Sequence, residues 1–232
     1  MLDEKKLDER LYQELSFPLN VYACCVLWQE GSVDYLHYGL FSQPSDHVFE
    51  AQDRSTDVLL NGLPPAPACI LEVGIGLGTL QQKLTEKNYQ VTGITPDQKQ
   101  IDIAQTQFPE QAKDLSCESF EDYKTTNSFD VILLQESAQY INSLFLFNHA
   151  FTLLKDNGSI VLVDEFRLKA NLAGQDYLHL LTHFIDQAKR CGFKLITQQD
   201  YSKQSNPTID YLLKVIKKFK STNCFACSKL PE

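Results

Sequence analysis

The chain has 232 residues, 43% of them hydrophobic, and its 30 acidic and 21 basic residues give a formal net charge of -9. This length and composition are those of one globular domain, which excludes a disordered, collagen-like or coiled-coil protein. The acidic balance argues against a nucleic-acid partner, and no apolar run reaches the ~18 residues that a membrane-spanning helix needs.

Cysteine and histidine usage indicates the compartment and argues against a metal. The seven cysteines are odd in number and irregularly spaced, which is typical of free thiols, so we expect a cytoplasmic protein. Cys224 and Cys227 form a CxxC pair, but no second pair stands nearby to complete a metal site. His179 and His183 are predicted to share a helix without a third ligand, so no metal is expected.

The first 60 residues are predicted to form an N-terminal arm, because a proline-rich break follows at residues 61–67. The arm is dense in aromatic residues, which need a surface to bury against. Its most distinctive segment is His-Tyr-Gly-Leu-Phe at residues 37–41.

Beyond the break, apolar runs alternate with helical patterns. Strands are predicted at residues 69–73, 90–95, 128–134, 158–163 and 193–198, and helices at 77–88, 97–107, 143–155 and 177–191. Near-continuous apolar strands indicate a mainly parallel sheet that is covered on both faces. We therefore predict a doubly wound α/β fold over residues 61–220, with a tail at 221–232.

The segment 209–219 allows two interpretations. Ile209, Leu212, Leu213 and Ile216 follow the helical spacing, and Pro207 suits the start of a helix. The same segment also alternates apolar and polar residues, so a final strand paired with 193–198 stays open.

The most informative segment is an apolar strand that runs into three alternating glycines, Glu-Val-Gly-Ile-Gly-Leu-Gly at residues 72–78. Glycines let a ligand approach the backbone, and amides at the following helix start can face its polar groups. The spacing GxGxG differs from the GxGxxG of nicotinamide oxidoreductases. It resembles motif I of the class I S-adenosylmethionine-dependent methyltransferases. The resemblance implies a cofactor site that contains Glu72, Gly74, Gly76 and Gly78.

The next strand ends in Thr95 and Pro96, and Gln100 follows. Most of these methyltransferases carry an acid at this strand end, which holds the two ribose hydroxyls. Thr95 and Gln100 instead resemble a branch that includes cyclopropane-fatty-acid synthases and some small-molecule methyltransferases. The resemblance implies that Thr95, Pro96 and Gln100 contact the cofactor, through neutral hydrogen bonds where a carboxylate is usual.

Two later loops are expected at the same edge of the sheet. Glu118 and Ser119 follow the third strand, and the resemblance places them near the adenine, with helix capping by Ser119 or Ser116 as the alternative. Gln135, Glu136 and Tyr140 follow the fourth strand and are expected to face the reaction site.

The segment 37–41 resembles the HYGxF segment that precedes motif I in tocopherol-type and sarcosine-type methyltransferases. The resemblance implies that the arm is a helical lid and that Tyr38 and Gly39 contribute to the cofactor pocket. His37 is either a catalytic or substrate-contacting residue or a partly buried ring with a satisfied nitrogen.

The resemblance covers roughly residues 31–200 and implies methyl transfer from S-adenosylmethionine to a small-molecule N, O or C acceptor, with S-adenosylhomocysteine as product. His37, Glu136 and Tyr140 are the candidate catalytic residues. A cyclopropane-type lipid-modifying enzyme and a cofactor-binding protein without turnover stay open as alternatives. Family members close a seven-stranded sheet, so a helix at 209–219 would leave the seventh strand missing. Such an open edge would favour pairing with a second copy in a homodimer.

Overall fold

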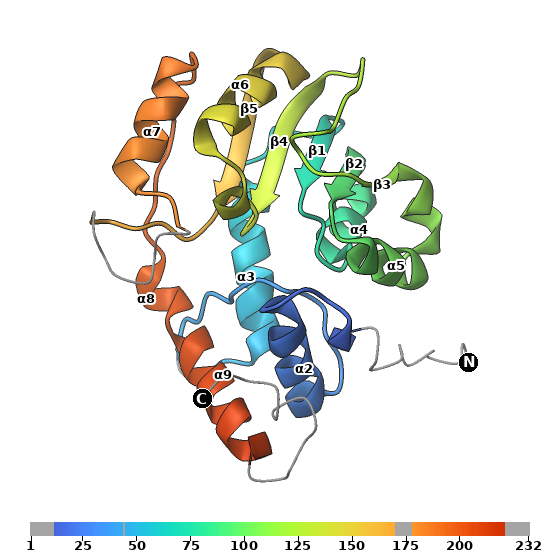
Figure 1. The fold of residues 1–232 in the computed structure, drawn as a ribbon, viewed down its shortest axis with the longest axis vertical. Helices are drawn as coiled ribbons and strands as arrows, with labels where there is room; N and C mark the ends of the chain where they lie inside the picture. The colour runs from blue at the N-terminus through green and yellow to red at the C-terminus, as the bar shows by residue number, and fades with distance from the viewer. Residues whose placement is uncertain (1–11, 44, 170–177, 221–232) are drawn as a thin grey trace.

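The computed structural model describes residues 12–43, 45–169 and 178–220. Its centre is a parallel sheet of five strands in the order β3-β2-β1-β4-β5 (Figure 1). The strands are β1 (Cys69–Val73), β2 (Gln90–Thr95), β3 (Leu115–Cys117), β4 (Phe129–Gln135) and β5 (Leu154–Val163). Because the strand order reverses between β1 and β4, a ligand crevice is expected at the carboxyl ends of these two strands.

Helices cover both faces of the sheet, which confirms the predicted α/β class. They are α4 (Thr79–Glu86), α5 (Gln98–Gln107), α6 (Ser143–Leu153) and α7 (Leu181–Arg190), with short 3₁₀ turns at Pro109–Asp114 and Ala138–Tyr140. Successive residues of β1 pack into hydrophobic clusters on opposite faces of the sheet, because side chains alternate along a strand. Ile70 packs in one cluster with Leu84 of α4, whereas Leu71 packs in another with Phe147 of α6.

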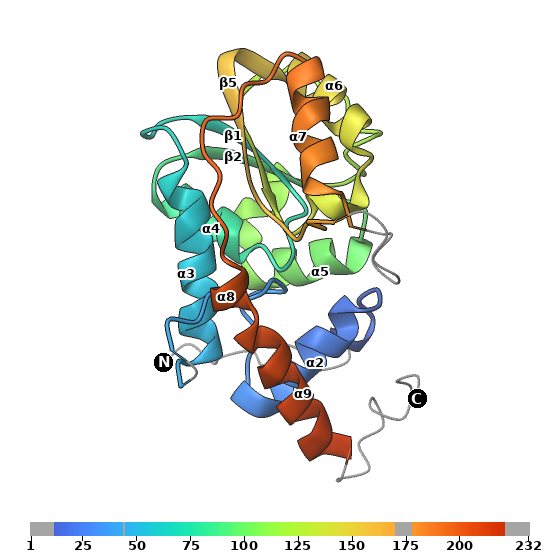
Figure 2. The same ribbon diagram turned by 90° about the vertical axis from the view of Figure 1, so that its left-hand side faces the viewer.

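A separate helical layer lies beyond the carboxyl ends of the strands (Figures 1 and 2). It contains α2 (Leu19–Glu30), α3 (Val48–Asn61), α8 (Ser202–Ser205) and α9 (Pro207–Lys220). α9 packs against α2, and α3 extends upward to contact β4 and β5. The chain therefore returns at its C-terminal end to pack on its own N-terminal arm.

The structure contradicts the strand predicted at 193–198. Residues 193–200 have no strand structure, and Leu195 and Ile196 are 48% and 83% exposed. Strand propensity without a paired neighbour does not stabilise a strand, because ladder hydrogen bonds and packing supply most of its stability. Within the described residues, β5 pairs only with β4, and the expected seven-stranded sheet is not present.

The segment 209–219 is helical, which decides between the two interpretations of the sequence. Proline is tolerated in the first turn, where its missing amide costs nothing, and α9 begins at Pro207. Val215 is 3% exposed, and Tyr211 and Leu212 pack against the arm cluster that contains Tyr22. Burial of this helical stripe outweighs the weaker alternating pattern.

The structure also corrects the histidine pair. His179 precedes α7, and its Nε2 lies 2.9 Å from the carbonyl oxygen of Ile141, whereas His183 lies on α7 beside Gln187. The two histidines therefore do not share a helix. Among the described residues, no group of three or more His, Cys, Asp or Glu could hold a metal ion. Cys224 and Cys227 lie outside the described residues.

Candidate functional site

The glycine turn after β1 has the backbone shape that only glycine adopts readily. Gly74, Gly76 and Gly78 have φ of 84°, 54° and 84°. A Cβ atom on Gly74 would lie 2.6 Å from the Cβ of Ser137, and one on Gly78 would lie 2.9 Å from the Cβ of Ala104. A Cβ on Gly76 would meet no protein atom within 4 Å. Packing explains the first and last glycines, whereas Gly76 faces open space.

Glu72 lies immediately before this turn and has a buried carboxyl group. The residue is 2% exposed, and its Oε2 has no hydrogen-bond partner among the described residues. Burial raises the pKa of Glu72 to about 8. Buried polar atoms are normally hydrogen-bonded, so an unpaired oxygen in a native structure indicates a ligand or water that donates to it.

The strand end at Thr95 is satisfied within the chain. Thr95 Oγ1 donates to Gln100 Oε1 at 2.8 Å, and both side chains are buried. Asp97 caps α5 by accepting a hydrogen bond from the amide of Lys99. The structure thus brings Thr95 and Gln100 together, as the sequence indicated, and the amide nitrogen of Gln100 remains for another partner. Pro96 lies between them on the surface.

The residues after β3 reach the same sheet edge but make local contacts. Glu118 is exposed. The Oγ of Ser119 accepts a hydrogen bond from the amide of Asp122 at 3.1 Å within a turn. The expected helix capping is wrong, because no helix begins at Ser119 and Ser116 lies in β3.

The backbone of Tyr38 connects the arm to the loop after β4. Its amide donates to Glu136 Oε1 at 2.9 Å, and its carbonyl lies 2.9 Å from His37 Nδ1. A carbonyl only accepts, so Nδ1 carries the proton, and Nε2 can accept from Thr56 Oγ1 at 3.3 Å. Two candidate catalytic residues therefore hold the backbone of one arm residue, Glu136 through its N–H and His37 through its carbonyl.

His37 is the buried ring that the sequence left as one of two possibilities. It is 7% exposed, and burial lowers its pKa to about 4. Both ring nitrogens have partners inside the protein, so the ring is neutral and acts on the arm backbone. This arrangement does not offer His37 a free nitrogen for an acceptor.

Glu136 differs from His37 because one carboxyl oxygen remains beyond its bond to the arm. Its backbone has φ of 53°, an unusual value for a side chain larger than glycine, and its amide donates to the carbonyl of Val163. Burial of the carboxyl group raises its pKa well above the ordinary value, and the neighbouring Asp164 and Glu165 add to this. Among the other loop residues, Tyr140 is 65% exposed and Gln135 Nε2 lies 3.5 Å from Thr56 Oγ1.

Gly39 has a packing explanation. A Cβ on this residue would lie 2.6 Å from the Cβ of Ala51 in α3. Its amide donates to Thr208 Oγ1 at 3.1 Å, so the segment 37–41 is held by both α3 and α9. The sequence pattern identified the segment 37–41, but it did not predict the contact with Thr208, which lies 169 residues further along the chain.

Asp164 was missed in the sequence. It follows β5, and its carboxylate accepts from the amides of Ala138 and Gln139 at 2.7 and 3.2 Å. It thereby fixes the loop that carries Glu136 and Tyr140, while burial raises its pKa to about 7. An acid directly after a buried parallel strand is the signal that could have revealed it.

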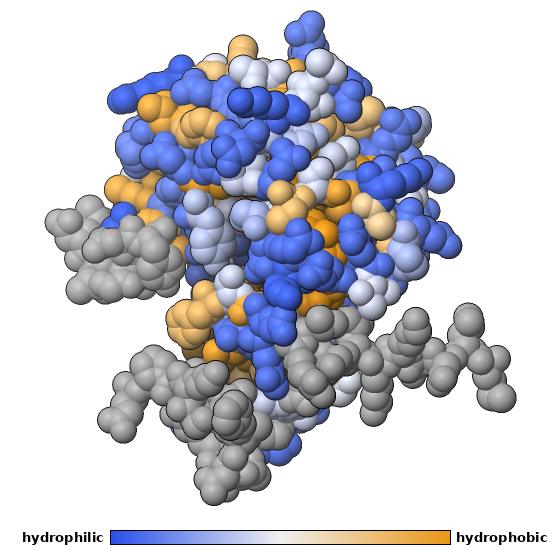
Figure 3. Space-filling view, turned by 45° about the vertical axis from the view of Figure 1, so that its right-hand side comes forward, coloured by the Kyte–Doolittle hydropathy of each residue, from blue (hydrophilic) through white to orange (hydrophobic). Residues whose placement is uncertain are grey.

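The arm is attached directly to the helix that follows the glycine turn. Thr79 Oγ1 donates to the carbonyl of Asp34, and Lys83 Nζ pairs with Asp53 Oδ1. Leu77, in the turn itself, is buried in the arm cluster. Figure 3 shows apolar surface in the recess between the sheet-bearing part and the helical layer. The candidate site therefore lies between the sheet edge and an arm that is anchored beside it.

Comparisons with known proteins agree with this arrangement. Residues 71–162 match a family model described as a methyltransferase domain. The fold is that of solved structures including the cyclopropane synthase MmaA2 from Mycobacterium tuberculosis, with a TM-score of 0.72 and 16% identity over 95% of this chain and 87% of that one. The cyclase SpnF aligns with a TM-score of 0.76 and 19% identity, over 86% of this chain and 78% of that one. Residues 71–162 thus match a methyltransferase domain, and the chain shares the fold of these solved structures.

Among curated proteins, the chain is similar to a ubiquinone biosynthesis O-methyltransferase of Bradyrhizobium diazoefficiens. The two are 27% identical over 133 residues, which are 56% of this chain and 50% of that protein. The chain therefore spans about half the length of this curated relative.

Proposed function

We propose that the protein binds S-adenosylmethionine and transfers its methyl group to a small-molecule acceptor. The observation that carries the proposal is the unpaired buried oxygen of Glu72, in the strand that leads into a turn where Gly76 faces open space. A turn that only packed against its own protein would need neither feature. The matched methyltransferase domain begins in the same strand.

The residues present fit such a cofactor. Glu72 would accept a hydrogen bond from a donating or positively charged group, and Gly76 would allow close approach to the backbone. The amide of Gln100 is placed to bind a hydroxyl, with Thr95 fixing its orientation. Glu118 and Ser119 at the end of β3 complete the proposed rim. The bound cofactor would supply an electrophilic methyl group, so the protein's task is alignment and exclusion of water.

For the reacting groups, we propose different roles for the three candidates. His37 and one oxygen of Glu136 position the backbone of Tyr38 over the sheet edge. The raised pKa of Glu136 suits a carboxyl that holds or accepts a proton near neutral pH. Tyr140 is exposed on the same loop and would contact the acceptor.

The proposed lid follows from the anchoring of the arm. Because Thr79 of α4 bonds to the arm at Asp34, a ligand at the glycine turn would also stabilise the arm. Hydrogen exchange of arm amides should slow when S-adenosylmethionine binds. Exchange that is unchanged at saturating cofactor would leave the arm as fixed structural packing.

Three further expectations are proposals. The edge of β5 has no described partner besides β4, which supports a homodimer formed by edge pairing. Cys69, Cys117 and Cys191 are free thiols, which supports a reducing compartment such as the cytoplasm. The acidic charge supports the expectation that nucleic acid is not a partner.

A lipid-modifying reaction of the cyclopropane type is the second candidate, supported by the fold shared with MmaA2 and by Thr95 and Gln100. The presence of a cyclase among the solved structures with this fold means that the fold alone does not define the reaction. Turnover with small acceptors, with dispersed lipids or with neither separates these candidates from a cofactor-binding protein without turnover.

Calorimetry with S-adenosylmethionine and S-adenosylhomocysteine tests the cofactor step. The native protein should bind both, and Gly76→Val should lose binding, because its side chain would fill the open space. Gly31→Val is a matched control: Gly31 also has positive φ, at 84°, and a Cβ there would meet nothing within 4 Å, but it ends α2 in the arm. Equal affinity in Gly76→Val and the native protein would remove the proposal.

A further inference from the structure

The C-terminal helix α9 has a charge opposite to that of the whole protein. Its sequence contains four lysines and one aspartate, whereas the chain has a formal charge of -9. Lys214, Lys217 and Lys218 are exposed. Basic charge concentrated on one surface of an acidic protein indicates a partner with negative charge.

Large apolar side chains lie beside these lysines. Ile209 and Leu213 are 41% and 48% exposed, and they stand four residues apart, so they share one face of α9. Lys217 follows Leu213 by one further turn on the same face. On other sides of the helix, Val215 is buried, and Tyr211 and Leu212 pack against the arm cluster. The outward side of α9 therefore presents apolar and basic groups together.

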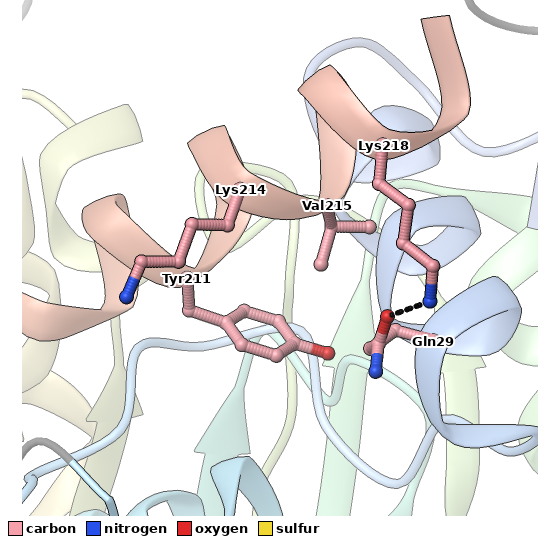
Figure 4. Close-up of a pocket in the computed structure, with 5 residues that line it drawn as sticks. All are labelled: Gln29, Tyr211, Lys214, Val215 and Lys218. Carbon is pink, nitrogen blue, oxygen red and sulfur yellow. Dashed lines mark hydrogen bonds between the residues drawn. The ribbon is translucent and has the colours of Figure 1, made fainter. Parts of the chain in front are cut away.

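A shallow groove separates α9 from α2 along the lysine side of the helix. It has a volume of about 200 Å³ and is lined by Gln29, Tyr211, Lys214, Val215 and Lys218. Figure 4 shows the aromatic ring of Tyr211 and the side chain of Val215 between the two lysine chains. Lys218 donates to Gln29 Oε1 at 2.8 Å, while Lys214 extends away from that pair.

Glu30, which contacts the groove residue Tyr211, already has partners for both carboxyl oxygens. Glu30 accepts from Tyr211 Oη at 2.8 Å through one oxygen and pairs with His47 at 2.9 Å through the other. Asp210 is the single acid of α9 itself and lies one turn before Lys214. These contacts leave a net positive surface over the lysine side of the helix.

From this combination we propose that α9 docks the protein on an anionic lipid surface. The lysines would lie against negatively charged headgroups, and Leu213 and Ile209 would enter the interface. A partner protein that was merely acidic would not require the exposed apolar residues. Such an interaction is peripheral: among the described residues, no helix is long and apolar enough to cross a membrane. The proposal does not depend on methyl transfer.

Vesicle co-sedimentation tests it with the full chain. Binding to phosphatidylcholine vesicles that contain phosphatidylglycerol should exceed binding to phosphatidylcholine alone by about tenfold at low salt, and it should fall as salt screens the lysines. The double variant Lys214→Glu/Lys217→Glu should lose this preference. Leu213→Ser should weaken binding with less effect on the preference for anionic vesicles.

The matched control is Lys87→Glu/Lys124→Glu, which makes the same change of charge at exposed lysines of the sheet-bearing part. It should bind vesicles like the native protein. Equal loss in both double variants would show a general charge effect and overturn the proposal. Equal binding of the native protein to both vesicle types, or no binding to either, would also overturn it. Circular dichroism of each variant shows that the fold is retained.

Discussion

Two carboxyl groups lie at the carboxyl ends of the neighbouring strands β1 and β4, and their surroundings differ. Glu136 after β4 has a protein partner, the amide of Tyr38, whereas Glu72 at the end of β1 has an oxygen with no partner among the described residues. Both have raised pKa values because of burial. Glu136 thus contributes to the architecture of the arm, while Glu72 keeps an oxygen for a partner outside the described residues, which we propose is a ligand.

The same contrast holds for two glycines. Gly39 is required because Ala51 lies against it and leaves no room for a Cβ atom, so packing explains this glycine. Gly76 has no atom opposite the missing side chain. Packing therefore explains Gly39, whereas Gly76 combines open space with a place in the turn after β1, where we propose that the ligand binds. The following predictions test this division between ligand-directed and structural residues, in order of decreasing effect.

The largest expected effect is the contribution of Glu72 to the pH dependence of the free energy of unfolding. In the folded protein the Glu72 carboxyl group has a pKa of about 8, whereas in the unfolded chain it has the ordinary value of 4.5. Stability should therefore fall as pH rises through this window, by roughly 4 to 5 kcal/mol from this group. In Glu72→Gln this contribution should vanish. Urea unfolding at several pH values measures the difference, and identical slopes for both proteins would contradict the assignment.

Gly39→Val should destabilise the free protein by about 3 kcal/mol, because its side chain would overlap α3. Gly76→Val should cost less, since only backbone strain opposes it. Thermal unfolding without ligand compares the two variants. The division between the glycines fails if Gly76→Val is the less stable one.

Glu136→Ala should cost about 2 kcal/mol, because the amide of Tyr38 loses its acceptor at the edge of the core. Glu136→Gln retains an acceptor oxygen and should be closer to the native protein. Denaturant unfolding of both variants separates loss of the hydrogen bond from loss of charge. Equal destabilisation by the two changes would show that charge, and not the hydrogen bond, holds the arm.

The smallest effect is expected at Thr95. Thr95→Val removes the hydroxyl that fixes Gln100, which should lower stability by about 1 kcal/mol and weaken cofactor binding by a similar amount. Unfolding and calorimetry on the same preparation give both values. Unchanged binding would mean that Gln100 does not need this orientation.

Local sequence signals predicted the parts that depend on neighbouring residues. The strand, glycine turn and helix at 69–86 are set by apolar periodicity and positive φ, and the structure contains them with small changes of boundary. The contacts of His37 could not be predicted, because Thr56 lies on α3 and nothing in the pattern fixes how that helix docks. The strand expected at 193–198 failed for a related reason, since strand formation depends on a partner elsewhere in the chain.

The most direct test of the central claim is the number of protons released when S-adenosylmethionine binds near pH 7. In the free protein Glu72 is largely protonated, because its pKa is about 8. A positively charged ligand near this carboxyl favours the ionised form, so calorimetry in buffers of different ionisation enthalpy should show release of up to about one proton. Glu72→Gln should release none. Binding of the native protein without proton release, or equal release by the variant, would contradict the claim that Glu72 is the ligand-directed carboxylate.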